Sequence, residues 1–381
     1  MKRLLLVGAG HAHAQVLKDW IGRPVPGCDV TIVSPHAMTP YSGMVPGWLA
    51  GTYRFDEMSI DFAALAEAAG ARFLVDEMIG LDPKRRQVRL RGGSPLDYDV
   101  LSLNVGSTLA APVASPGERV RILSMRPLDK LRHAWEALLA DPRITTADTP
   151  LNVTAVGGGA AGVESLLATL NRLRSMRPGR PVRGALITSS ATLLPGLAPA
   201  AARSANNALE AAGVVVRTGR NYDDSVARSS DIVLWATGAE AHPWQSGSGL
   251  AVSDRGFIRV DERLRSCSDP QVHAVGDCAE WAQPLPKAGV FAVRMGPILS
   301  RNLRAALGVG TPLAYAPQRR YLALLSTADG RAIASWGGWS LAGRWLWRWK
   351  DRIDRAFVRR FVIAAPSFTT NHPTPVSGEP E

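Results

Sequence analysis

Two glycine-rich segments of the chain could hold the phosphates of a nucleotide. The first segment, GAGHAH, begins at Gly8 and follows an apolar stretch at residues 4–7. Where a strand turns into a helix, glycines let backbone N–H groups approach a pyrophosphate, and the helix N-terminus favours its negative charge. Gly8 and Gly10 fit this pattern, but His13 stands where the third glycine belongs. The first segment alone therefore predicts a nucleotide site only weakly.

The two histidines of this segment have two interpretations. His11 and His13 could be polar residues facing solvent at the start of a helix. They could also lie near a phosphate, where partial protonation would add positive charge. A metal site is not expected, because the histidines are two residues apart and no nearby cysteine or acidic residue completes a ligand set.

The second glycine segment satisfies Gly-x-Gly-x-x-Gly in full, with Gly157, Gly159 and Gly162. The first glycine allows the tight turn, the second allows close approach to a pyrophosphate, and the third lets helix and strand pack closely. Because a β-rich run precedes this segment and a helical pattern follows it, we expect a dinucleotide site here.

Neither glycine segment is followed by the acidic residue that commonly binds the adenosine ribose. The first unit ends in IVSP and the second in ITSS. In the first, Ser34 or His36 could take the place of the acid. In the second, its absence permits NADPH, with Ser189, Ser190 and Arg203 near a 2′-phosphate, or it means that nicotinamide nucleotides bind poorly.

The elements that must position these loops can be read from the surrounding sequence. KRLLLVGAGHAHAQVLKDW followed by DVTIVSP, and LNVTAVGGGAAGVESLLATLNRL followed by RGALITSS, each form a strand, glycine loop, helix and second strand. This is the βαβ unit of a dinucleotide fold. Two such units predict an α/β protein with two Rossmann-like domains. Two later turns, ATG at Gly238 and GD at Gly276–Asp277, complete the order of motifs.

In that order the motifs resemble the FAD-dependent pyridine nucleotide-disulfide oxidoreductase superfamily over nearly the whole chain. Within it the sequence is more similar to type II NADH dehydrogenases and sulfide:quinone oxidoreductases. It is more similar still to the oxidoreductase module fused ahead of selenophosphate synthase in some bacterial proteins. The stretches that carry this likeness are GAGHAH, TPYSGMVPG, YDVLSLNVGS, GGGAAGVE, WATGAEA, LPKAGVFAVRMGP and WKDRIDRAF.

The resemblance implies a glutathione reductase-like division of the chain. Residues 1–110 and 240–314 would form a discontinuous FAD-binding domain, and residues 111–239 an NAD(P)H-binding domain. Residues 315–365 would form a small C-terminal α+β or helical segment, followed by a polar, disordered tail at 366–381. A homodimer is compatible with this class.

The resemblance also assigns cofactor-binding residues. The first loop, with Gly8, Gly10 and His11, would hold the FAD pyrophosphate, the second loop would bind NADH or NADPH, and Asp277 would bind the flavin ribityl or phosphate. The complete set of cofactor-binding residues that we expect is Gly8, Gly10, His11, Ser34, Tyr41, Gly106, Gly157, Gly159, Gly162, Gly238, Gly276, Asp277, Lys287 and Ala288.

The chemistry implied is hydride transfer from NAD(P)H to FAD, followed by electron transfer to a small acceptor such as a quinone. The three cysteines, Cys28, Cys267 and Cys278, form no redox pair, which argues against disulfide reduction and sulfide oxidation. They also suit a reducing cytoplasm. Glu164 matches a glutamate near the nicotinamide, although it could equally be an ordinary first-turn acid. Lys287 could stabilise negative charge on the reduced flavin.

The acceptor is less well indicated. Type II dehydrogenases carry glutamines around the quinone pocket, whereas the helix after Lys287 reads VFAVR. Two other functions therefore stay open. One is a flavoprotein partner of a selenium-metabolism enzyme such as selenophosphate synthase. The other is a flavin dehydrogenase or oxidase of an organic substrate.

The net charge of +11 could favour binding to nucleic acid, to a membrane surface or to an anionic ligand. No zinc spacing or RNP-like stretch accompanies it, so nucleic acid is not expected. In GRWLWRWKDRIDRAFVRRF, helical spacing places aromatic and aliphatic residues on one arc and arginines on another. This pattern suits the anionic cytoplasmic face of a membrane, or a helix docked on the protein's own core or a partner. The apolar arc comprises Trp345, Leu346, Trp349, Ile353 and Phe357.

Overall fold

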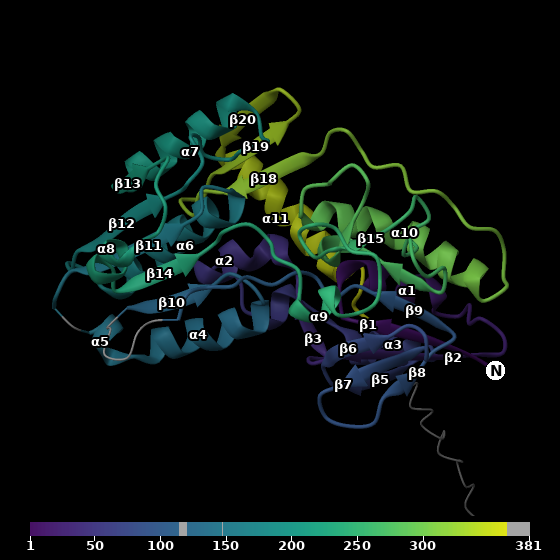
Figure 1. Ribbon diagram of the computed structural model, residues 1–381. Coiled ribbons are helices and arrows are strands. Elements are labelled where there is room, and N and C mark those ends of the chain that lie inside the picture. The colour runs from purple at the N-terminus through teal and green to yellow at the C-terminus, as the bar shows by residue number, and fades with distance from the viewer. Residues whose placement is uncertain (114–119, 147, 364–381) are drawn as a thin grey trace, which may run out of the picture.

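Two parallel five-stranded sheets dominate the computed structural model, which describes residues 1–113, 120–146 and 148–363 (Figure 1). The predicted tail at 366–381 lies outside the described residues. The first sheet has the order β16-β9-β1-β2-β5. Its strands are β1 (Lys2–Val7), β2 (Cys28–Ser34), β5 (Arg72–Val75), β9 (Val100–Leu103) and β16 (Val272–Ala274).

The second sheet has the order β10-β14-β11-β12-β13. In each sheet the strand before the glycine loop pairs in parallel with the strand after the helix, in the registers Lys2↔Cys28 and Leu151↔Val182. The α/β fold with two Rossmann-like sheets is therefore confirmed. The strands of the second sheet are β10 (Arg121–Ser124), β11 (Leu151–Val156), β12 (Val182–Ile187), β13 (Val214–Arg217) and β14 (Ile232–Trp235).

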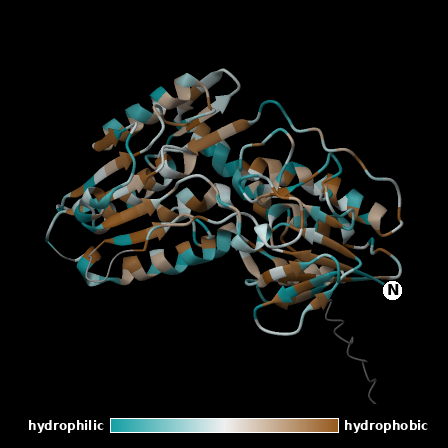
Figure 2. Ribbon diagram, viewed as in Figure 1, coloured by the Kyte–Doolittle hydropathy of each residue, from teal (hydrophilic) through white to brown (hydrophobic). Residues whose placement is uncertain are grey.

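Helices cover the two sheets and bury the apolar strands between layers. In Figure 2 the strands are the most hydrophobic ribbons, as expected for parallel strands buried on both faces. Helices α1 and α10 pack against each other beside the first sheet, while α6 and α7 pack on the second. The helices are α1 (His11–Trp20), α2 (Val45–Leu49), α3 (Phe62–Ala68), α4 (Leu128–Ala140), α5 (Pro142–Thr145), α6 (Ala160–Met176), α7 (Pro199–Ala211), α8 (Asp224–Ser229), α9 (Pro243–Ser246), α10 (Gly289–Ala306) and α11 (Arg344–Arg359).

Smaller elements complete the first lobe, which is the part of the molecule built around the first sheet; the second lobe is built around the second sheet. A three-stranded meander packs on the first sheet, where Leu81 and Val88 share a core with Leu5 and Val33. Its strands are β6 (Met78–Asp82), β7 (Gln87–Leu90) and β8 (Leu96–Asp97). Two short pairs lie nearby. The strands β3 (Met38–Pro40) and β4 (Ser59–Asp61) are antiparallel, and β15 (Ile258–Arg259) and β17 (Ala279–Glu280) are parallel.

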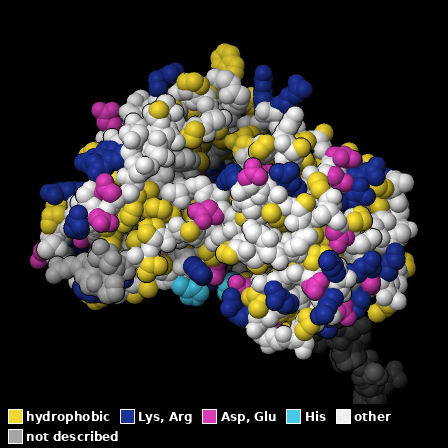
Figure 3. All heavy atoms as spheres, viewed as in Figure 1, with side chains coloured by type: hydrophobic (Ala, Val, Ile, Leu, Met, Phe, Trp, Pro, Cys, Tyr) yellow, Lys and Arg dark blue, Asp and Glu magenta, His cyan; other side chains and the backbone are white. Residues whose placement is uncertain are grey.

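The C-terminal part forms an antiparallel sheet and one long helix, in line with the expected α+β segment. The strands are β18 (Leu322–Ser326), β19 (Ala332–Trp336) and β20 (Trp339–Gly343). Helix α11 follows β20 directly and packs on β19 through Leu346. In Figure 1 this helix runs between the two lobes, and in Figure 3 Lys and Arg side chains are spread over both lobes.

Candidate functional site

The first glycine loop is held against the end of β9. Gly8 has a left-handed backbone, with φ of +93°, and its N–H donates to the Val33 carbonyl at 2.8 Å. A side chain at Gly8 or at Gly10 would overlap Asn104. Both glycines are therefore required by the packing of the protein itself, as well as by any phosphate.

Asn104 is a site residue that the sequence motifs do not reveal. Its Oδ1 accepts hydrogen bonds from the N–H groups of Ala12 at 3.1 Å and His13 at 3.4 Å. Its Nδ2 donates to the Val275 carbonyl at 3.0 Å. One side chain thus connects the start of α1 with the Gly276–Asp277 turn. Its signals in the sequence are a polar residue directly after a buried strand and its place in YDVLSLNVGS, one of the stretches that carry the family resemblance.

His13 is buried between α1 and the sheet, so the interpretation that it faces solvent is wrong. Its Nδ1 lies 2.7 Å from the Gly8 carbonyl and its Nε2 lies 2.8 Å from Ser102 Oγ. Because a carbonyl only accepts, Nδ1 carries the proton and Nε2 accepts from the Ser102 hydroxyl. Burial lowers the pKa of His13 to about 4, and the ring is neutral at pH 7. In the second loop, the position equivalent to His13 is Gly162. A side chain there would overlap the Gly157 carbonyl.

His11 lies at the start of α1 in an aromatic cluster with Tyr41 and Phe357. The ring centroids are 5.3 Å apart for His11 and Tyr41, and 4.5 Å for Tyr41 and Phe357. Burial lowers the pKa of His11 to about 4, although the charge of Asp277 opposes this. Its Nε2 is buried and has no hydrogen-bond partner among the described residues. An orphaned ring nitrogen at a helix N-terminus fits an oxygen of a bound ligand.

Asp277 follows Gly276 at the same edge of the sheet and forms an ion pair that the sequence did not predict. The Arg126 guanidinium donates to Asp277 and also to Ser107 Oγ. Ser107 itself donates to Asp277 over 3.4 Å. Next to this group, Gly106 has a φ of +72° and no atom within 4 Å of where a side chain would begin. Its backbone therefore borders space that a ligand can occupy.

The remaining residues expected near the flavin meet around the start of α10. Lys287 Nζ donates to the Ala279 carbonyl at 2.6 Å and lies 3.8 Å from the centroid of Phe257. Burial lowers the pKa of Lys287. Ala288 precedes α10, and a side chain at Gly289 would approach Ser42 Oγ to 3.3 Å. The loop at Tyr41 and the Lys287 segment are consequently neighbours.

Ser34 and His36 lie where the first unit lacks an acid. Ser34 ends β2 beside the glycine loop and is buried. His36 is exposed, and its Nε2 lies 3.2 Å from Asp129 on α4. Cys278 is buried, and desolvation raises the pKa of its thiol to about 11. The thiol is therefore protonated and suits packing.

The second glycine loop has the geometry that its motif predicts. Gly157 has a φ of +122°, and Gly162 packs so closely that a side chain would overlap the Gly157 carbonyl. By contrast, a side chain at Gly159 or Gly238 would meet no atom within 4 Å. Tight turn, close packing and bare backbone are the three features that a bound dinucleotide needs.

Glu164 is half-buried and belongs to an ionic cluster, with the buried Lys350 and Asp354, that joins three parts of the chain. Its Oε1 accepts from the Ser326 N–H at 2.7 Å. Desolvation raises its pKa to about 7, while the charge of Lys350 opposes the shift. Lys350 Nζ donates to Asp354 Oδ2 and to the Gly43 carbonyl, both at 2.6 Å. Glu164 is thus more than a solvated first-turn acid, and Lys350 and Asp354 are further residues that sequence reasoning missed.

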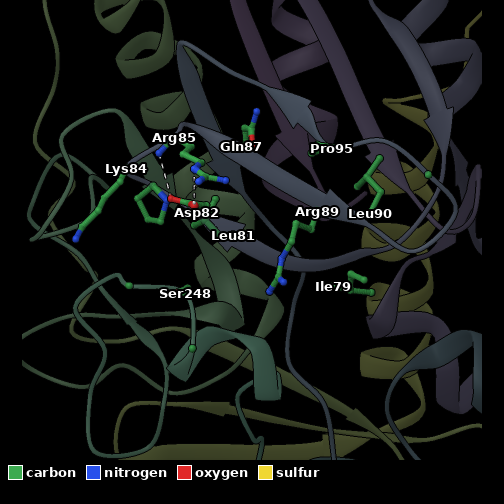
Figure 4. Close-up of a pocket in the computed structure, with 14 residues that line it drawn as sticks. Ile79, Leu81, Asp82, Lys84, Arg85, Gln87, Arg89, Leu90, Pro95 and Ser248 are labelled. Carbon is green, nitrogen blue, oxygen red and sulfur yellow. Dashed lines mark hydrogen bonds and ion pairs between the residues drawn. The ribbon is translucent and has the colours of Figure 1, made fainter.

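A separate cavity of about 780 Å³ opens on the antiparallel meander (Figure 4). Lys84, Arg85 and Arg89 contribute to its wall, together with Ser248 from the loop after α9. None of the predicted site residues lines it. Its wall includes neither of the two dinucleotide-binding loops nor the N-terminus of a long helix, so we do not assign it to a cofactor.

Two parallel sheets with a glycine loop each, and bare backbone beside both loops, define a flavoprotein that also binds a pyridine nucleotide. The chain matches the pyridine nucleotide-disulphide oxidoreductase family over residues 2–296 and belongs to it. It is an NAD(P)H-dependent flavoprotein oxidoreductase, with FAD and NAD(P)H as cofactors.

Individual relatives are distant in sequence. The chain is 24% identical to ferroptosis suppressor protein 1 of Taeniopygia guttata over 74% of this chain and 75% of that protein. It is 25% identical to putidaredoxin reductase of Pseudomonas putida, over 74% and 68%. Among solved structures, Plasmodium falciparum NDH2 in complex with NADH superposes with a TM-score of 0.76 at 14% identity, over 94% and 97% of the two chains. The structural likeness shows the fold alone.

Proposed function

We propose that the protein transfers hydride from NAD(P)H to FAD and passes the electrons to a quinone or a similar lipophilic acceptor, without a redox disulfide. One observation carries this proposal, namely the two sides of α11. Its buried side brings Lys350 and Phe357 to the residues expected around the flavin. Its outer side exposes tryptophans. A single helix therefore connects the candidate site with a surface suited to lipid.

The residues fit FAD and NAD(P)H on the evidence of the orphaned His11 nitrogen and the bare glycine backbones. The first loop, His11 and Asp277 would hold FAD, and the second loop would hold NAD(P)H. When bound, FAD accepts a hydride and releases two electrons. Lys287 would stabilise negative charge next to it.

Glu164 would supply the proton that the reaction consumes. Reduction of a quinone by NAD(P)H takes up one proton from solution, in addition to the hydride, to form the quinol. With a pKa of about 7, the Glu164 carboxyl can both hold a proton and release it at neutral pH. Lys350, held between Asp354 and Gly43, would stabilise the carboxylate that remains.

The exposed surface, here termed the Trp–Arg face, combines the β19–β20 turn with the outer side of α11. The predicted apolar arc divides, because Leu346 and Phe357 are buried while Trp345 keeps 58% of its surface exposed. Trp339 is 82% exposed and pairs with Trp336 across the turn. The face comprises Trp336, Trp339, Leu341, Trp345, Trp349 and Ile353, with exposed Arg344, Arg348 and Arg352.

Such a face suits the boundary of an anionic membrane, where tryptophan rings and basic side chains both bind favourably. Figure 3 shows a hydrophobic side chain projecting from the top of the molecule, with Lys or Arg side chains beside it. No helix in the described part of the chain is long and apolar enough to cross a membrane. We therefore propose peripheral contact.

Anaerobic titration tests the proposed function. NADH or NADPH added to the flavin-loaded protein should bleach the flavin absorbance, and a soluble quinone added next should restore it. Bleaching without reoxidation by quinone would contradict the acceptor. No bleaching with either nucleotide would contradict the hydride step and favour a flavoprotein that oxidises an organic substrate.

A further inference from the structure

The end of β12 lacks the negative charge that selects NADH. Thr188 follows the last residue of β12, and residues 188–198 contain no Asp or Glu. A carboxylate at this place in a βαβ unit binds the ribose 2′-hydroxyl of NADH and would repel a 2′-phosphate. Thr188 instead packs on the glycine loop, since a side chain at Gly158 would come within 2.9 Å of its Cγ2. The position is neutral and lies against the phosphate-binding loop.

Two arginines from the next strand and its loop flank Thr188. The Thr188 N–H donates to the Arg217 carbonyl at 3.0 Å, and the Arg220 N–H donates to the Thr188 carbonyl at 2.9 Å. These bonds place both arginines beside the end of β12, although they are far from it in the sequence. The pairing of β12 with β13, in register Ile187↔Arg217, creates this arrangement.

The two arginines differ in how firmly their side chains are engaged. The Arg217 side chain is exposed and makes no hydrogen bond or ion pair within the described residues. Arg220 donates to Asp223 Oδ2 at 3.2 Å and to Ser225 Oγ at 3.1 Å. Asp223 is itself the N-cap of α8, where it accepts from two backbone N–H groups. Of these two guanidinium groups, that of Arg217 is therefore the one free to bind a ligand.

From this arrangement we propose that the second loop prefers a nucleotide with a 2′-phosphate, so that NADPH is the hydride donor. The inference rests on the proposed use of this loop for the nicotinamide nucleotide. A 2′-phosphate carries close to two negative charges at pH 7 and accepts charge-assisted hydrogen bonds from arginine. Ser189 and Ser190, which follow Thr188, provide further hydroxyl donors. NADH offers only a hydroxyl group to these residues.

Calorimetric titration of the flavin-loaded protein with nucleotide fragments tests this preference. The probes are 2′,5′-ADP and 5′-ADP, which carry the same number of phosphates and differ in where the second one is attached. We expect 2′,5′-ADP to bind about tenfold more tightly or better, and Arg217→Ala to remove about tenfold of its affinity. The affinity for 5′-ADP should not change.

Arg183→Ala is the matched control, because it removes an exposed arginine from the second residue of the same strand, β12. It should leave both affinities unchanged. Equal binding of the two fragments, or an Arg217→Ala protein that still prefers 2′,5′-ADP fully, would overturn the proposal. An equal loss in Arg183→Ala would also overturn it, because the effect would then be non-specific attraction to a basic protein.

Flavin reduction separates this inference from the proposed function. At limiting concentrations NADPH should bleach the flavin faster than NADH, and Thr188→Glu should reverse the order. Equal rates with the two nucleotides would refute the preference and leave the hydride step intact. Bleaching by neither nucleotide would refute the proposed function, and the fragment titration would still decide which adenosine phosphate the loop prefers.

Discussion

The Glu164 carboxyl group has a pKa near neutral pH. Burial raises the pKa of its carboxyl group from 4.5 to about 7 in the folded protein. The folded state thus binds a proton that the unfolded state releases between these two values. The stability that this proton contributes is fully present below about pH 4.5 and is lost as the pH rises through 7.

Replacing Glu164 with Gln should therefore change how stability depends on pH. Gln keeps an oxygen to accept from the Ser326 N–H but cannot ionise. Melting temperatures of the variant and the natural protein should agree most closely near pH 4.5 and diverge in favour of the variant by pH 8. The measurement is thermal unfolding at a series of pH values. Parallel curves for the two proteins would show that Glu164 does not titrate in this range.

A substitution at Gly10 tests whether the first loop holds FAD. A side chain at Gly10 would overlap Asn104, so Gly10→Val should displace the loop from the end of β9 and abolish FAD binding. Flavin content is read from the absorbance of the purified protein. Gly93→Val is the control, because a side chain at Gly93 would meet no atom within 4 Å and its φ is not positive. Full FAD occupancy in Gly10→Val would refute the assignment of this loop.

Glycine motifs identify a site well, whereas lone polar residues do not. Gly8, Gly10 and Gly157 were predicted because glycine at these spacings has few explanations other than a tight turn. Asn104 and Arg126 were missed, since each acts through one side chain on a distant partner and belongs to no spacing pattern. His13 was misread for a related reason. Its partner Ser102 lies on a strand whose position beside β1 only the fold establishes.

At the scale of elements, α11 has two different sides. Its pattern of aromatic and basic residues predicted one apolar arc and one cationic arc. The folded helix instead buries Leu346, Lys350, Asp354 and Phe357 and exposes Trp345 and Trp349. The periodicity of the sequence predicted the helix and its amphipathic character. It did not show that a Lys–Asp pair lies on the buried side, because i,i+4 charges on a helix are usually solvated.

Replacing only one member of the Lys350–Asp354 pair should strongly lower the stability of the protein. In Lys350→Met, the Asp354 carboxylate stays buried without its partner and Gly43 loses a hydrogen bond. Removing one member of a buried ion pair costs about 3–5 kcal/mol. We expect a loss of that order in the free energy of unfolding, measured with denaturant.

Two further variants complete this test. Lys350→Met with Asp354→Leu should recover much of the loss, because no unpaired charge then remains buried. Arg352→Met, on the exposed side of the same helix, should change stability by no more than about 0.5 kcal/mol. A single variant as stable as the natural protein would mean that the pair is accessible to water.

On the scale of the whole molecule, the fold brings the C-terminal segment to both lobes. Lys350 contacts Gly43 of the first lobe, while the Ser326 N–H on β18 contacts Glu164 of the second. The cluster around Glu164 and Lys350 is therefore assembled from three parts of the chain, and the Trp–Arg face lies on the segment that joins them. The sequence predicted each part separately, but contacts between parts depend on how the lobes pack.

The Trp–Arg face predicts binding to anionic membranes that depends on charge and on tryptophan. Each basic residue near such a surface contributes about 1 kcal/mol. Arg348→Glu should therefore weaken binding by about 2 kcal/mol, or roughly thirtyfold, in vesicle flotation at low salt. Trp345→Ser with Trp349→Ser should weaken the part of the binding that persists at high salt, where charges are screened.

Arg228→Glu on α8 makes the same charge change at an exposed position away from this face and should leave flotation nearly unchanged. If the natural protein does not float with anionic vesicles while its flavin is still reduced by NAD(P)H, the membrane contact is wrong and the hydride chemistry is unaffected. The exposed tryptophans would then favour a protein partner, since a patch of this composition is rarely left uncovered. The proposals on hydride transfer and on membrane contact can be refuted independently, because flavin reduction depends on the two glycine loops and membrane binding depends on the outer side of α11.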